Sequence, residues 1–412
     1  MTKIKTNRNN TNNVPPLRFP EFSGEWRYSL LGNECNILCG YPFDGQDMQE
    51  SSGNVKLLRG INITEGEIRH SNELDRYYSG DISKLGKYIL KEGDLVIGMD
   101  GSKVGRNSAI LTICEQGSYL VQRVCRIRSQ KHNVEYIFQH INNSKFHKYV
   151  DSIKTASAIP HISQSDIQDY TISFPPTAEE QIKITSLLSL LDARIATQNK
   201  IIEDLEQLKS ALTDQLYSGQ LRFHEFADDW GVSTFGHLTE HFSHRNRNSK
   251  HYPVFSVTKD TGFIPQEEQF ESREITGDDI SSYKIIRQGE FAYNPARINV
   301  GSIARYDNET PCLISSLYVC IKPAADIDSD WLLYLLKSKR AIFYYNLYGE
   351  GGVRIYLFYP NFSRIKVKVP SIQEQHRIAA LLKYIADKIL QEKKLKDLYM
   401  AQKQFLLQRL FI

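Results

Sequence analysis

A chain of 412 residues is too long for one typical hydrophobic core, so we expect two to four separately packed units. Its 41% hydrophobic and 24% charged residues are usual for a globular protein, and no apolar run reaches the ~20 residues of a membrane helix. The net charge of +3 excludes a strong overall field for nucleic acid, so any charge that binds nucleic acid has to be local. Six scattered cysteines favour free thiols in a reducing cytoplasm over a disulfide scaffold or a zinc site.

The chain begins with a polar stretch and then a motif that returns. Residues 1–13 are mostly Asn, Thr and Lys with little to bury, so we expect a disordered tail. The following motif of Arg, aromatic residues and Glu, with a Trp at fixed spacing, recurs at an offset of 204: Arg18-Phe19-Pro20-Glu21-Phe22 with Trp26, and Arg222-Phe223-His224-Glu225-Phe226 with Trp230. The repeat indicates two related halves.

The region after each motif has the pattern of short strands with some helix. In the first region we expect strands over residues 88–90, 94–98, 109–114 and 119–128, and a helix over 135–151. In the second we expect strands over 290–293, 302–306 and 317–322, and a helix over 330–347. Both regions therefore share one design.

Each region is followed by a long helix. The segments 176–217 and 370–411 align without a gap at an offset of 194, and both open with Pro, then Thr or Ser, two further residues, and Glu-Gln. A Thr or Ser three residues before Glu predicts a capping box, in which the hydroxyl and the carboxylate each accept a hydrogen bond from a free backbone N–H. Helices of roughly 40 residues would be about 60 Å long.

Apolar residues along both helices follow alternating three- and four-residue steps, which is the pattern of a heptad seam. Gln198 and Lys209 interrupt the first seam, and we expect them to be solvated or to mark where partner helices complete a bundle. Two equal seams in one chain favour an intramolecular antiparallel pair over helices that each pack only on their own globular half. The predicted fold class is α+β, with two similar globular domains separated by a pair of long antiparallel coiled-coil helices in a pseudo-twofold repeat.

No catalytic constellation stands out. The segment Asn294-Pro295-Ala296-Arg297 lacks the second proline and the aromatic residue with which adenine-N6 methyltransferases hold the target base. The glycine-rich stretch 98–105 lacks the Gly-Lys-Ser/Thr of a phosphate loop. The sequence therefore favours a binding protein without catalytic residues of its own.

Polar and cationic loops are the candidates for contact with DNA. Residues 244–251 contain three fixed cations and no acid, and the loops 102–107 and 294–301, which follow equivalent predicted strands, share that pattern. Residues 154–161 and 349–356 also occupy matching places, with small residues that let the backbone approach a phosphate. The candidate DNA-binding residues are Lys103, Arg106, Asn107, Lys154, Ser157, His161, Arg245, Asn246, Arg247, Asn248, Lys250, Asn294, Arg297, Asn299, Arg354 and Tyr356.

Two globular halves that each end in Pro-Thr/Ser-x-x-Glu-Gln and a heptad helix resemble the specificity subunit of Type I restriction-modification systems, over residues 14–412. The resemblance implies that residues 14–175 and 220–369 are target recognition domains, each reading one part of a bipartite, asymmetric double-stranded DNA target. Residues 176–219 and 370–412 would be the spacer helices. The chain itself would be non-catalytic and cytoplasmic.

The resemblance also implies partners. Two modification subunits, which methylate adenine at N6, would dock on the paired helices, and two restriction subunits that translocate and cleave DNA would join them. S-adenosylmethionine, ATP and Mg are then expected on those partners, with no cofactor or metal on this chain. The exposed helix face that carries Lys183, Arg194, Lys200 and Glu203 is the expected docking surface.

The sequence leaves two alternatives open. The first is a stand-alone DNA methyltransferase or nuclease with a divergent active site, which activity of the single purified chain would reveal. The second is a helical scaffold that binds only protein, which would leave no DNA footprint in the presence of modification subunits.

Overall fold

The computed structural model describes residues 13–51, 55–269, 280–352 and 354–412, so the expected disordered tail lies outside the described residues except for Asn13. The chain divides into two compact units: unit 1 comprises residues 1–197 and 396–412, and unit 2 comprises residues 198–395. Each unit contains one globular part and a stretch of both long helices. None of the described helices carries an apolar stretch long enough to cross a membrane.

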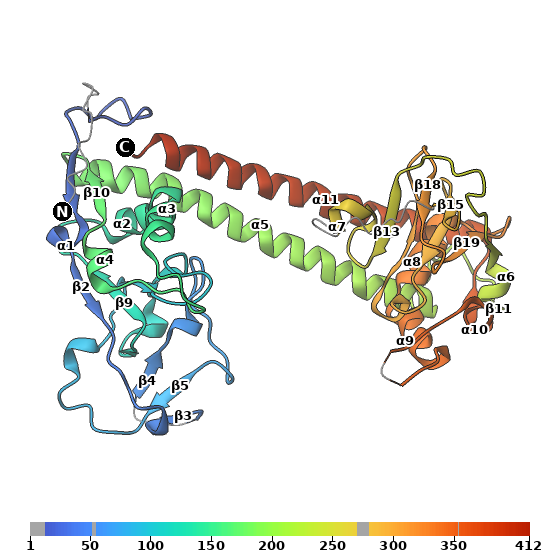
Figure 1. The fold of residues 1–412 in the computed structure, drawn as a ribbon, viewed down its shortest axis with the longest axis horizontal. Coiled ribbons are helices and arrows are strands. Elements are labelled where there is room, and N and C mark those ends of the chain that lie inside the picture. Colours follow the sequence, from blue (N-terminus) through green and yellow to red (C-terminus); the bar gives the residue numbers. More distant parts are fainter. Residues whose placement is uncertain (1–12, 52–54, 270–279, 353) are drawn as a thin grey trace. The chain divides into compact units, whose positions relative to one another are not determined.

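The globular part of unit 1 alternates short strands and short helices before the first long helix begins (Figure 1). Its elements are β1 (Arg27–Leu30), α1 (Leu31–Glu34), β2 (Asn36–Cys39), β3 (Met48–Gln49), β4 (Val55–Leu58), β5 (Arg76–Tyr78), β6 (Leu95–Gly98), β7 (Ser108–Ile110), β8 (Tyr119–Leu120), β9 (Val124–Arg128), α2 (Val134–Ile141), α3 (Ser144–Ile153), α4 (Gln164–Gln168), β10 (Thr171–Phe174) and α5 (Ala178–Ser218).

Unit 2 repeats this order with one additional short helix, α7 (Figure 1). Its elements are β11 (Gly231–Thr234), α6 (Phe235–Leu238), β12 (Thr239–Phe242), β13 (Val254–Thr258), β14 (Gly262–Pro265), α7 (Gln266–Gln269), β15 (Lys284–Ile286), β16 (Phe291–Tyr293), β17 (Ile303–Arg305), β18 (Cys312–Ile314), β19 (Val319–Pro323), α8 (Ser329–Lys337), α9 (Lys339–Tyr348), α10 (Tyr359–Phe362), β20 (Lys366–Val369) and α11 (Ile372–Arg409).

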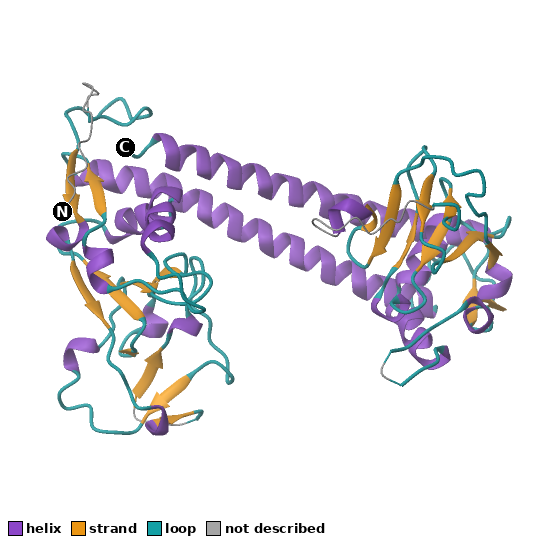
Figure 2. Cartoon of the chain, viewed as in Figure 1, coloured by secondary structure: helices purple, strands orange, loops and turns teal. Residues whose placement is uncertain are grey.

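The sheets confirm that the two globular parts share one design. An antiparallel sheet has the order β2-β9-β6-β7 in unit 1 and β12-β19-β16-β17 in unit 2. A second four-stranded sheet, β3-β5-β4-β8 or β14-β13-β18-β15, contains one parallel pair in each unit. The first and last strands then pair with each other, as β1 with β10 and as β11 with β20, directly before a long helix begins. In each unit the strands lie in the globular part (Figure 2).

The predicted elements differ from the observed ones where a polar residue caps a helix or the backbone turns. The single helix expected over 135–151 is two helices, because Asn143 caps α3, and Ser338 divides α8 from α9 in the same way. The strand expected over 119–128 breaks at Arg123, whose φ is 69°. The strand expected over 88–90 is only a single bridge between Ile89 and Tyr119.

Within each unit, α5 and α11 run antiparallel and pack on the globular core. In unit 1, Lys403 Nζ donates to Asp192 Oδ1 at 2.5 Å and Arg194 donates to the Tyr399 hydroxyl at 3.3 Å. The core of unit 1 contains the start of α5 and the end of α11, with Leu188 and Leu407 both buried. The core of unit 2 contains the end of α5 and the start of α11 in the same way. The helices therefore pair with each other and also pack on the globular parts.

The two residues that interrupt the seam, Gln198 and Lys209, are buried and partly buried within the chain. Gln198 is buried, and its amide donates to the carboxylate of Glu392, which lies at the equivalent position of the other long helix. Lys209 is partly buried with its Nζ 5.2 Å from the centre of the Tyr334 ring, and burial lowers its pKa. A single buried polar pair of this kind fixes the register of a coiled coil. Our expectation for Gln198 was therefore wrong.

Candidate nucleic-acid interface

Two of the candidate loops of unit 1 are joined by backbone hydrogen bonds. Gly101 N donates to Pro160 O at 3.0 Å, and Ile162 N donates to Met99 O at 3.0 Å. An isolated bridge between Asp100 and His161 completes the junction. Residues 99–107, which connect β6 to β7, and residues 154–161, which precede α4, therefore form one continuous surface.

The predicted cations of this surface are all matched by acids. Lys103 Nζ lies 2.9 Å from Glu65 Oε1. Arg106 makes a two-pronged contact with Asp151, at 2.5 Å for the shorter bond, and Lys154 Nζ lies 2.8 Å from the same carboxylate. Hydrogen bonds from Arg106 and Lys154 lower the pKa of Asp151 to about 2. The surface therefore carries much less unbalanced positive charge than the sequence suggested.

The other candidates in these two loops stabilise the loops themselves. The Ser157 hydroxyl donates to Ile159 O at 2.7 Å, and His161 Nδ1 lies 2.9 Å from the Thr155 hydroxyl. Asn107 is half-buried, and its carbonyl accepts from Gly98 N at 2.8 Å. These residues shape the surface, whatever it binds.

In unit 2, the basic loop 244–251 is folded around Asn246. This side chain is 1% exposed. Its Oδ1 accepts from Lys250 N at 3.0 Å, and its Nδ2 donates to Lys250 O at 2.9 Å and to Ile280 O at 3.4 Å. The amide that we expected to read a base edge is thus used to hold the loop closed, because a buried amide needs hydrogen-bond partners. Arg247, Asn248 and Lys250 are exposed around it.

The same loop borders a cavity of about 330 Å³. Its lining residues include four cations and no acid, and all of them are described: Arg245, Asn246, Arg247, Asn248, Lys250, Tyr252, Ile285, Arg287 and Pro311. None of the four cations forms an ion pair with a residue that the structure describes. Arg287 lies between β15 and β16, far from the basic loop in sequence, and only the fold brings it to this cavity.

A second surface of unit 2 corresponds to the joined loops of unit 1. Leu357 N donates to Pro295 O at 2.9 Å, which ties residues 354–357 to the loop between β16 and β17. Asn294 Oδ1 accepts from Ala296 N at 3.0 Å, and Asn299 Nδ2 donates to Asn346 Oδ1 at 3.1 Å. Arg297, by contrast, is exposed.

Arg354 and Tyr356 lie on this second surface as exposed side chains. The Tyr356 ring is 39% exposed and stands nearly parallel to the Phe358 ring, at an angle of 9° and a centroid distance of 6.3 Å. The structure therefore places the unit 2 candidates in two groups, one at the basic cavity and one here.

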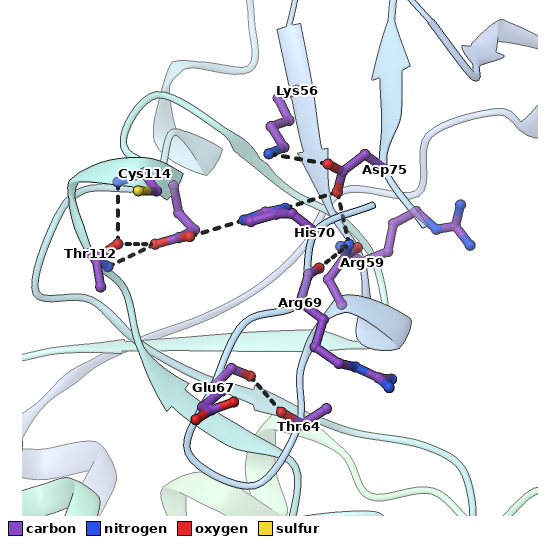
Figure 3. Close-up of polar contacts among 11 residues, drawn as sticks. Lys56, Arg59, Thr64, Glu67, Arg69, His70, Asp75, Thr112 and Cys114 are labelled. Carbon is purple, nitrogen blue, oxygen red and sulfur yellow. Dashed lines mark hydrogen bonds and ion pairs between the residues drawn. The ribbon is translucent and has the colours of Figure 1, made fainter. Parts of the chain in front are cut away.

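Sequence reasoning missed cations on a further loop of unit 1, residues 59–75. Asp75 and Glu115 hold His70 between them, at 2.9 Å from Nδ1 and 3.0 Å from Nε2, while the side chains of Arg59 and Arg69 point away from His70 (Figure 3). A Cβ built on Gly60 would lie 3.7 Å from Asp100 Oδ1, so this loop adjoins the joined loops. An available signal was that Arg59 follows directly on the strand β4.

No group of three His, Cys, Asp or Glu side chains able to hold a metal ion occurs among the residues that the structure describes. In the described part of the chain, the candidate binding groups are therefore the charged and polar side chains of these loops.

The chain is similar to specificity subunits of Type I restriction enzymes. The family model described as "Type I restriction modification DNA specificity domain" matches residues 25–207 and again residues 232–398. The chain is 26% identical over 201 residues to the Type I restriction enzyme EcoBI specificity subunit of Escherichia coli, a match that covers 48% of this chain and 39% of that relative. It is 21% identical over 332 residues to the MjaVIII specificity subunit of Methanocaldococcus jannaschii, covering 75% of this chain and 76% of the relative.

Two solved structures share the fold. The S subunit of a Type I restriction-modification system from M. genitalium superposes with a TM-score of 0.58 at 15% identity, over 97% of this chain and 99% of that chain. A chain from a structure of complex assembly and conformational transition in the type I R-M system superposes with a TM-score of 0.57 at 15% identity, over 94% of this chain and 97% of that chain. These similarities cover both units.

Proposed function

The chain belongs to the family of Type I restriction-modification DNA specificity domains, and from this premise we propose that it is the subunit that selects the DNA sequence on which a Type I restriction-modification enzyme acts. Two family domains in one chain support a target in two parts. Residues 14–175 and 220–369 would then be the two recognition domains, and residues 176–219 and 370–412 the spacer helices. A stand-alone enzyme and a protein-only scaffold are not favoured by this membership.

The observation that carries DNA recognition is the cavity of unit 2, which is lined by four cations without an acid. Lys and Arg at such a surface neutralise phosphates and release counterions, and Arg and Asn can also pair with base edges in the major groove. The exposed Arg297, Arg354 and Asn248 are the candidates for base contacts. Asn246, being buried, would act through the shape of its loop.

The two half-sites should differ in sequence. The globular parts share the strand order of one four-stranded sheet and of the terminal strand pair, but their loops present different residues. The cations of the joined loops of unit 1 are paired with acids, whereas those at the unit 2 cavity form no ion pair with a described residue. Because base readout depends on loop side chains, the target would be bipartite and asymmetric.

We propose further that α5 and α11 set the number of non-specific base pairs between the half-sites. Both helices run without interruption through the boundary between the units, at Thr197/Gln198 and at Leu395/Lys396. The paired positions Gln198 and Glu392 keep the two helices in one register, so a change of length in one helix requires a matching change in the other.

The test inserts about one helical turn into α5 between Ile195 and Leu212 together with the opposite turn of α11. With modification subunits present, sequencing of methylated adenines should show a longer spacer and two unchanged half-sites. The same insertion in α5 alone is the control and should abolish methylation, since it displaces Gln198 from Glu392. Altered half-sites with an unaltered spacer would refute the role of the helices.

The modification subunits would dock on exposed parts of the long helices, and the restriction subunits would join that complex. Of the expected docking residues, Lys183 pairs with Glu21 and Arg194 contacts Tyr399. Among the described residues, Lys200 pairs with Glu203 and Asp204 of its own helix. Leu190, Tyr384 and Leu398 are large apolar side chains exposed on these helices. We propose that a modification subunit covers these side chains when it docks. S-adenosylmethionine, ATP and Mg would reside on these partners.

A further inference from the structure

The Glu of the repeated Glu-Gln motif does not close the capping box that its spacing predicts. Thr177 does accept a hydrogen bond from Glu180 N, at 3.3 Å, but the Glu180 carboxylate points into the globular part instead. Both of its oxygens accept from Arg18, each at 2.7 Å, and Oε1 also accepts from the Trp26 indole at 3.3 Å. The side chain of Glu180 is 1% exposed.

Unit 2 builds the same contact from the second copy of both motifs. Glu374 accepts from Arg222 at 2.9 and 2.8 Å, one bond to each oxygen, and from the Trp230 indole at 2.9 Å. Its side chain is 2% exposed. The two motifs that the sequence repeats therefore meet at one buried carboxylate in each unit.

The Gln that follows makes a second link. Gln181 Oε1 accepts from Asn133 N at 3.2 Å, and Asn133 is the residue whose side chain caps α2. Gln375 Oε1 accepts from Asp328 N at 3.0 Å, and Asp328 caps α8 in the same way. Two adjacent side chains at the start of a long helix thus hold both the segment that enters the globular part and a helix inside it.

A buried ion pair adds little net stability, because the two charges lose their hydration, yet removal of one partner leaves an uncompensated charge. Such a contact fixes an orientation, because a planar guanidinium and an indole N–H can both bond to one carboxylate in only one arrangement. An apolar contact of the same size would allow the globular part to rotate on the helix.

We propose that Glu180 and Glu374 are positioning residues that fix each globular part on the start of its long helix and thereby set how strictly the enzyme measures the spacing of its half-sites. The proposal rests on bipartite recognition, as stated above. The residues touch no DNA; they act through the orientation of the loops that do.

The experiment uses the full chain with modification subunits on a DNA library in which both half-sites are fixed and the spacer length varies. We expect Glu180→Gln and Glu374→Gln each to raise methylation at spacers one base pair too long or too short, relative to the correct spacer, by roughly tenfold, the factor for loss of a hydrogen bond to a charged group. Base preferences within both half-sites should stay unchanged. Trp26→Phe, which removes only the indole donor, should give a smaller increase in methylation at the wrong spacers. This variant tests the same contact if the Gln variants fold poorly.

The conservative variant Arg18→Lys keeps the charge and loses the two-pronged geometry, so it should also relax the spacing. Lower overall methylation with a spacer preference as strict as that of the unaltered chain would overturn the proposal and leave a merely structural role. Failure of the unaltered chain to direct methylation to any bipartite sequence would instead overturn the proposed function.

Discussion

The joined candidate loops of unit 1 and the basic loop of unit 2 occupy different places in the shared fold and differ in electrostatic character. In unit 1, Lys103, Arg106 and Lys154 are each within 2.9 Å of a carboxylate. In unit 2, the cavity beside residues 244–251 gathers four cations with no acid among its lining residues. Because an ion pair within the protein already satisfies a cation, the unit 2 surface has more to gain from a phosphate. The shared scaffold therefore does not imply a shared mode of contact.

The largest effect is expected from removing the positive charge at the unit 2 cavity. Replacing Arg245, Arg247 and Lys250 by Ala should weaken DNA binding by on the order of a hundredfold and reduce the salt slope by about one for each phosphate that the chain no longer neutralises. The matched control replaces Lys103, Arg106 and Lys154 in unit 1, and should cost much less. Titration of labelled DNA at several salt concentrations measures both affinities. Equal losses of affinity in the two variants would contradict a larger contribution of the unit 2 cavity to DNA binding.

A second test separates the loop's shape from its charge. Asn246→Ala leaves the partners of a buried amide without hydrogen bonds and should lower the free energy of unfolding by about 1–3 kcal/mol. Asn248→Ala, two residues away and exposed, should change it by no more than about 0.5 kcal/mol. Chemical denaturation of both variants decides the matter. An unchanged free energy of unfolding in Asn246→Ala would mean that the loop does not depend on this side chain.

A third change should make unit 1 resemble unit 2. Asp151→Asn removes the carboxylate shared by Arg106 and Lys154, so both cations become available to phosphate. We expect affinity for DNA of unrelated sequence to rise by roughly threefold to tenfold, with a steeper salt dependence. Competition binding with random-sequence DNA measures the gain, and unchanged affinity would show that this surface does not face DNA.

The smallest effect concerns the Asp151 carboxyl and the dependence of stability on pH. The Asp151 carboxyl has a pKa of about 2 in the folded chain against an ordinary 3.8, so its contribution to stability is present above 3.8 and is lost as the pH falls towards 2. Stability should therefore show no pH dependence from this group between about pH 6 and 8, where it stays ionised in both states. An NMR titration of the carboxyl carbon gives its midpoint, and Arg106→Ala should shift that midpoint upwards. A midpoint near 3.8 in the unaltered chain would mean that the ion pair is absent in solution.

The sequence by itself determined the repeat, the two long helices and the family resemblance. The apolar steps along residues 176–217 and 370–411 predict helices because helical hydrogen bonds and seam contacts depend on neighbours three and four residues away. The matching start motifs then indicated two similar halves, which the common order of the sheets β2-β9-β6-β7 and β12-β19-β16-β17 confirms. Boundaries inside the halves were less accurate, since single residues such as Asn143 and Arg123 decide them.

Only the tertiary structure decided which side chains are free to act. The partners of Arg106 and Lys103 lie 45 and 38 residues away, and the Arg18 partner of Glu180 lies 162 residues away. Arg287 joins the unit 2 cavity only because β15 and the basic loop meet. Local pattern carries no information on such contacts, because a side chain's partner depends on how distant segments pack, and a cation reads the same in sequence whether or not an acid faces it.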